Sequence, residues 1–165
     1  MLYAVKLATC FALAFLAVHD VRFRRLPTRA VLLVAGLYFV GAPFAQASVA
    51  SLASHLGAAA MAFAIAAVLF HFGWLGGGDA KLAAAVFLWA GPPLAWPVLF
   101  IVSSCGLVLG LAMLAIRVRY RDPSAQLPGM LALFAPARGV PYGVALALGG
   151  MAAVWPLALR PLLIV

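Results

Sequence analysis

The stretch LAAAVFLWAGPPLAWPVLFIVSSCGLVLGLAMLAI, residues 82–116, contains no charged side chain. As one helix, rising about 1.5 Å per residue, it would be about 50 Å long. The hydrocarbon core of a bilayer is only about 30 Å thick. Because Gly91-Pro92-Pro93 removes two amide donors in the middle of the stretch, we predict that the chain turns back there and forms two helices.

The whole chain of 165 residues has the same character, with 68% hydrophobic and 8% charged residues. A water-soluble domain of this composition would have too little polar surface to cover itself, which predicts an integral membrane protein. A cleaved signal peptide does not explain the composition, because the first apolar run is followed by several others that would remain.

Runs of about 20 apolar residues, the length that spans a bilayer, recur along the chain. With the turn at Gly91, they predict an all-α, polytopic membrane protein of about six transmembrane helices, with a glycine-rich break before the fourth. We expect a single transmembrane domain over residues 1–165. The predicted segments are 2–19, 30–46, 55–75, the two halves of 82–116, and 140–160. Four tryptophans near the predicted helix ends, Trp74, Trp89, Trp96 and Trp155, suggest an aromatic belt.

The basic residues are distributed unevenly over this layout. Nine of the eleven Lys and Arg lie on one side and two on the other. By the positive-inside rule the nine are cytoplasmic, so both termini are expected outside. The formal net charge of +8 is then expected to meet anionic lipid headgroups, and we expect no nucleic-acid partner. The nine are Arg22, Arg24, Arg25, Arg29, Lys81, Arg117, Arg119, Arg121 and Arg138; the other two are Lys6 and Arg160.

Acidic residues are scarce: the chain has three aspartates and no glutamate. Asp122 precedes a proline in a loop, where it is typical of a turn. Asp20 and Asp79 fall at the predicted cytoplasmic boundary, where a carboxylate costs energy. Either both are boundary residues paired with nearby Arg or Lys, or they face each other. In a facing pair one carboxyl keeps a proton while the other takes a proton from water, as in an aspartic protease. The sequence leaves open which aspartate holds that proton.

The residues around the two acids carry further information. Gly76, Gly77 and Gly78 directly precede Asp79, and we expect them to interrupt the helix and to leave room for a substrate backbone. Lys81 is either a headgroup anchor or a residue that touches the substrate or supports the glycine loop. For His55 the sequence shows no partner.

Three motifs together resemble the prepilin peptidase family of intramembrane aspartic proteases. They are HDVRFRRLPT at 19–28, GGGDAKL at 76–82 and GVPYGVAL at 139–146. Thr28 stands where this family often has Asn, and the glycine-aspartate motif alone is shared with presenilin-like proteases. The resemblance covers essentially the whole chain. It implies a catalytic pair, Asp20 and Asp79, and no metal or cofactor. It further implies that Gly76, Gly77, Gly78, Lys81, Pro141, Tyr142 and Gly143 bind the substrate or support the loops.

The resemblance also implies an activity and a location. The expected substrate is a prepilin, whose short basic leader precedes an apolar helix and is cut at the cytoplasmic face of the bacterial inner membrane. No paired CxxC motifs precede the first helix, so the chain resembles the short, peptidase-only branch of Flp (Tad) pilus systems, and we expect no N-terminal zinc or methyltransferase domain.

Two other functional classes stay open at this point. One is a non-enzymatic transporter or proton-relay subunit that uses the two aspartates to move protons; the other is a presenilin-like intramembrane protease. The sequence indicates neither the oligomeric state nor which pilin is cut. Cys10 and Cys105 each lie in an apolar segment without a ligand-spaced partner, which favours neither a zinc site nor a disulfide.

Overall fold

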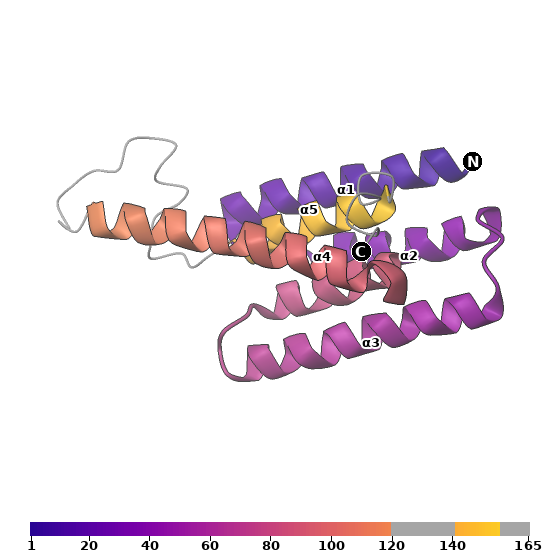
Figure 1. The fold of residues 1–165 in the computed structure, drawn as a ribbon. Helices are drawn as coiled ribbons and strands as arrows, with labels where there is room; N and C mark the ends of the chain where they lie inside the picture. Colours follow the sequence, from indigo (N-terminus) through magenta and orange to yellow (C-terminus); the bar gives the residue numbers. More distant parts are fainter. Residues whose placement is uncertain (120–140, 156–165) are drawn as a thin grey trace.

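The structure is a computed structural model that describes residues 1–119 and 141–155. Within these ranges the chain is helical throughout, apart from short connections, which confirms the predicted all-α, membrane-like fold (Figure 1). Helix α1, most of α4, and α3 are long and apolar enough to cross a membrane, whereas α2 and α5 are shorter apolar helices. The helices are α1 (Leu2–Phe23), α2 (Thr28–Phe44), α3 (Val49–His71), α4 (Gly77–Arg119) and α5 (Tyr142–Val154).

The described residues form five helices, so the predicted count of six is not confirmed. The expected turn instead appears as one non-helical residue, Gly91, inside α4. In Figure 1 α4 doubles back in mid-length. No loop separates the two stretches, because Pro92 and Pro93 occupy a first helical turn, where amide donors would have no intrahelical acceptor in any case. Residues 156–160 of the last predicted segment lie outside the described ranges.

His55 from α3 stabilises the break in α4. Gly91 has φ 60° and ψ −177°, a region that is essentially restricted to glycine, and a Cβ there would overlap the His55 imidazole. The carbonyl of Leu88 would normally accept from the amide of residue 92, but proline has no amide hydrogen. His55 supplies the missing donor, since its Nδ1 donates to Leu88 O at 2.8 Å. His55 therefore has a partner that the sequence did not reveal.

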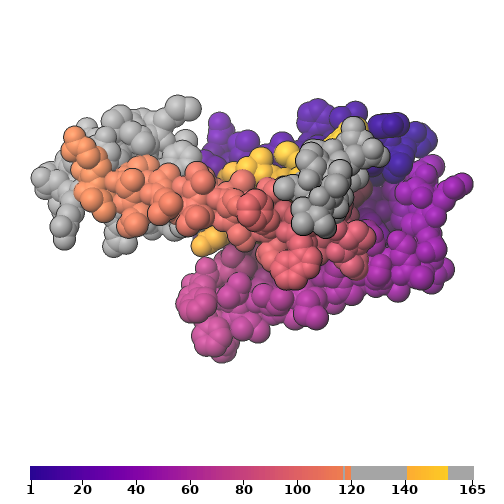
Figure 2. Space-filling view, viewed as in Figure 1, coloured from indigo at the N-terminus to yellow at the C-terminus, as the bar shows by residue number. Residues whose placement is uncertain are grey.

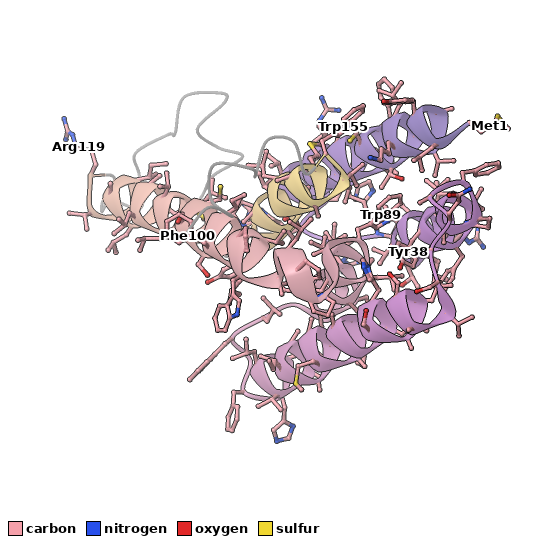
Figure 3. All side chains as sticks on the ribbon, turned by 45° about the vertical axis from the view of Figure 1, so that its right-hand side comes forward. Met1, Tyr38, Trp89, Phe100, Arg119 and Trp155 are labelled. Carbon is pink, nitrogen blue, oxygen red and sulfur yellow. The ribbon has the colours of Figure 1, made fainter. Side chains whose placement is uncertain are left out.

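Trp89 lies between helices and not in an exposed belt position. Its indole N–H donates to Val34 O at 2.9 Å, and its ring meets Tyr38 edge-on with centroids 5.6 Å apart (Figure 3). The expected belt position is therefore wrong for Trp89. Trp74 and Trp96 are 72% and 80% exposed, as a belt requires.

Because of the way the helices pack, the termini of three helices lie together at one end of the bundle. Helix α4 packs against α2, α3 and α5, and α5 also packs against α1. Leu13, Leu16, Val34, Leu82 and Val86 form the centre of the core and are almost fully buried. The end of α1 and the starts of α4 and α5 meet at the end of the bundle opposite the break in α4 (Figure 1).

We predict that Gly91→Ala destabilises the protein. The backbone strain alone is expected to cost about 1–3 kcal/mol, and the added methyl group would also displace His55 from Leu88. Thermal unfolding of the purified chain in detergent micelles measures the loss. The matched control is Gly36→Ala in α2, where a Cβ meets nothing within 4 Å. Equal stability of the two variants would contradict the role given to the break.

Candidate active site

Asp20 lies in the last turn of α1 and is 6% exposed. Its carboxylate Oδ2 accepts a hydrogen bond of 2.9 Å from the backbone N–H of Gly143, in the first turn of α5. A Cβ on Gly143 would lie 2.7 Å from this Oδ2, so only glycine lets the carboxylate come so close. The first amides of a helix carry partial positive charge, and α5 therefore stabilises a carboxylate that the core would otherwise exclude.

Asp79 is held by the start of its own helix. The carbonyl of Gly76 accepts the first helical hydrogen bond, from Ala80 N at 3.1 Å, so Gly76 is the N-cap of α4. The Asp79 carboxylate reaches back to the backbone amide of Gly76, which is one half of a capping box, since glycine has no side chain to complete the other half. A Cβ on Gly76 would lie 2.7 Å from Oδ2 of Asp79. The other oxygen, Oδ1, is buried and makes no hydrogen bond to any residue in the described ranges.

The predicted glycine-rich break before the fourth helix is not confirmed, because Gly77 and Gly78 are already helical and only Gly76 precedes α4. Their backbone fits the first turn, where Asp79 supplies the capping contact. Gly78 instead permits a close contact between segments: a Cβ there would lie 2.9 Å from Cβ of Leu26, in the α1–α2 connection. This contact, which no sequence signal indicated, draws the end of α1 toward the start of α4. The role predicted for the glycines beside a substrate backbone stays a prediction.

Asp20 and Asp79, predicted as a pair from the sequence, lie close enough for their negative charges to repel each other. Each carboxylate faces the N-terminus of a helix, α5 for Asp20 and α4 for Asp79. Arg24 and His19 also act electrostatically on Asp20. Repulsion between neighbouring carboxylates favours one shared proton, which is the state that acid–base catalysis by such a pair requires.

The remaining predicted residues surround this pair. Lys81 Nζ donates to Thr28 Oγ1 at 3.2 Å, which ties the start of α4 to the start of α2; its predicted role at the glycine loop or the substrate stays a prediction. Pro141 is fully buried and precedes α5. Tyr142 packs beside Gly106 of α4. His19 Nδ1 donates to Arg25 O at 2.7 Å, so this histidine holds the α1–α2 connection.

Comparison with known proteins places the chain in a family. A model of the type IV leader peptidase family matches residues 7–111, a span that includes both aspartates and the glycine run. The chain belongs to the type IV leader peptidase family. The resemblance seen in the sequence is thus confirmed, and membership in this leader peptidase family indicates a peptidase of the prepilin type. The Pro-Tyr-Gly element at 141–143 lies beyond the matched span. None of the curated proteins and none of the solved structures matches the chain.

We predict that Gly143→Ala impairs leader peptidase activity without loss of the fold. The methyl group would push Asp20 away from the start of α5, and a catalytic group displaced by about 1 Å can lose about 100-fold in rate. Cleavage of a leader-bearing precursor by the purified protein measures the effect. Gly57→Ala, where a Cβ meets nothing within 4 Å, is the control. Full activity of Gly143→Ala would show that this contact does not matter.

The Lys81–Thr28 contact predicts a measurable coupling. Lys81→Met and Thr28→Val should each cost no more than about 1 kcal/mol, since the pair is exposed to solvent. A double-mutant cycle of unfolding free energies should show that the two losses are not additive. Thr28→Ser keeps the hydroxyl acceptor and serves as the control. Strict additivity would mean that Lys81 is only an anchor to lipid headgroups.

Proposed function

We propose that this chain is a membrane-embedded aspartic endopeptidase that removes the short basic leader from prepilin-like precursors of the Flp type. Asp20 and Asp79 are the catalytic pair in this proposal. The observation that supports it most is the convergence of both carboxylates on helix N-termini, within the span that matches the leader peptidase family. The other residues that surround the pair position it.

The proposed chemistry needs one ionised and one protonated carboxyl group. The ionised one takes a proton from water, and the resulting hydroxide attacks the peptide carbonyl. The protonated one polarises that carbonyl and then gives its proton to the leaving nitrogen. Oδ1 of Asp79, which is buried without a hydrogen bond to the described residues, is free to bind the attacking water or the proton of Asp20. Asp20 Oδ2 is held by Gly143.

We further propose that the chain lies in the bacterial inner membrane, with the acids near the cytoplasmic face and both termini outside. The clustering of basic residues in the sequence supports this orientation. Arg22, Arg25 and Arg29, next to the Asp20 end of the bundle, are exposed and suited to anionic headgroups. The partner is the prepilin, whose leader would meet the acids from the cytoplasm.

The two aspartates are expected to act as one unit. Asp20→Asn and Asp79→Asn should each lower the rate of precursor cleavage by about 10²–10⁴-fold, the range for loss of a general acid or base. The double variant should be no slower than the single ones, since residues of one catalytic unit do not contribute additively. Coexpression with a prepilin, followed by detection of the shortened product, is the measurement.

The matched control is Asp122→Asn, which makes the same chemical change at the remaining aspartate. It should cleave at the wild-type rate. Full cleavage by both Asp20→Asn and Asp79→Asn would exclude the aspartic mechanism. A proton-relay function, by contrast, would lose proton movement in these variants and show no precursor cleavage in the wild type.

A further inference from the structure

An apolar groove of about 810 Å³ runs between α3 and the second half of α4. In Figure 2 the surface is hollowed between these two helices, and in Figure 1 they diverge toward the C-terminal end of α4. Among the described residues that line the groove, Ser103, Tyr142 and the indole of Trp96 are the only polar groups. Met61 and Leu107 on its walls are more than 60% exposed, and Ile65, Leu111 and Leu114 are more than 50% exposed.

Two residues that line the groove are chain neighbours of the residues that contact the two carboxylates. Leu75 lines it and directly precedes Gly76, the residue against which Asp79 is held. Tyr142 also lines it and directly precedes Gly143, which donates to Asp20. An extended segment at the two acids can therefore continue into the groove without leaving the protein.

The groove can hold about three turns of a helix between the level of Tyr142 and Ala95. Tyr142 meets the α4 wall beside Gly106, which leaves about 17 Å of wall up to Ala95 at a rise of about 1.5 Å per residue. The facing walls carry small residues four positions apart, at Ala58, Ala62 and Ala66 on α3 and at Gly106 and Gly110 on α4. Such spacing allows another helix to approach closely.

We propose that this groove binds the apolar helix of the substrate, the segment that follows the scissile peptide bond. This inference rests on the proposed function and adds a binding site to it. The helix packs between α3 and the second half of α4, and its N-terminal end unwinds at Leu75 and Tyr142 to present the peptide bond to the acids. Lipid acyl chains and a second copy of this chain are the competing occupants, and neither explains why the groove includes Leu75 and Tyr142, the chain neighbours of the residues that hold the two carboxylates.

Site-specific photo-cross-linking tests the occupant. The cross-linker p-benzoylphenylalanine replaces Ala62, which lines the groove, or Ala64, which lies on the same helix outside it and is exposed. Both variants carry Asp20→Asn to retain the substrate, and both are expressed with a prepilin in membranes. We expect position 62 to capture the apolar helix of the prepilin and position 64 to capture lipid. Equal capture of the prepilin from both positions, or capture of lipid or a second copy alone from position 62, would overturn the proposal.

A kinetic experiment separates the groove from the catalytic pair. Gly110→Leu fills the groove, whereas Gly57→Leu makes the same change outside it; a Cβ at either position meets nothing within 4 Å. For a prepilin with its helix, Gly110→Leu should raise KM at least about tenfold, as one or more misplaced methylene groups do in an apolar site. For a short peptide that contains only the leader and the cleavage junction, KM should stay unchanged.

The outcomes distinguish the two proposals. An equal rise in KM for both substrates, or no rise for either, would overturn the groove proposal while the protease function stands. If the wild type cleaves neither substrate, the proposed function fails, and the cross-linking result still decides what the groove binds. Gly57→Leu should behave as the wild type with both substrates.

Discussion

The main physical constraint on this structure is that two carboxylates lie within an apolar helical bundle. Burial of a carboxylate without hydrogen-bond donors is very unfavourable in free energy. In this chain the N-termini of two helices supply the donors. The start of α5 donates to Asp20 from Gly143, and the start of α4 holds Asp79 through Gly76. Each helix end also contributes the positive end of its dipole. The same two contacts that offset the cost of burial also hold the two carboxylates close to each other.

Glycine allows this close approach because it has no side chain, and not because it is flexible. At Gly76 and Gly143 a Cβ would collide with the carboxylates themselves, and at Gly78 it would collide with Leu26. Gly143 lets the end of α1 approach the start of α5, Gly78 lets the α1–α2 connection approach the start of α4, and Gly76 lets Asp79 fold back onto the start of its own helix. A run that resembles a flexible linker is therefore closely packed.

The long helix α4 links the catalytic end of the bundle to the opposite end. Its first stretch begins at the acids, and its second stretch returns along the outside after Gly91. The return creates the wall that faces α3 and so creates the groove. His55 stabilises the reversal because it satisfies the Leu88 carbonyl that Pro92 leaves without a donor. The break thus determines where the groove lies.

The sequence by itself determined the helical membrane class, the pairing of two acids as a candidate site and the position of the reversal at Gly91. Hydropathy, charge and the absent amide of proline are local properties, and they can be read without knowing any partner. Only the tertiary structure decided that Gly143 holds Asp20 across 123 positions, that Gly78 meets Leu26, that His55 completes the break and that Trp89 packs inward. These contacts depend on how each helix is rotated and how closely its neighbours approach, because packing between distant segments sets both. The sequence thus identified the two acids as a candidate pair, and the packing of α1, α4 and α5 brings them together.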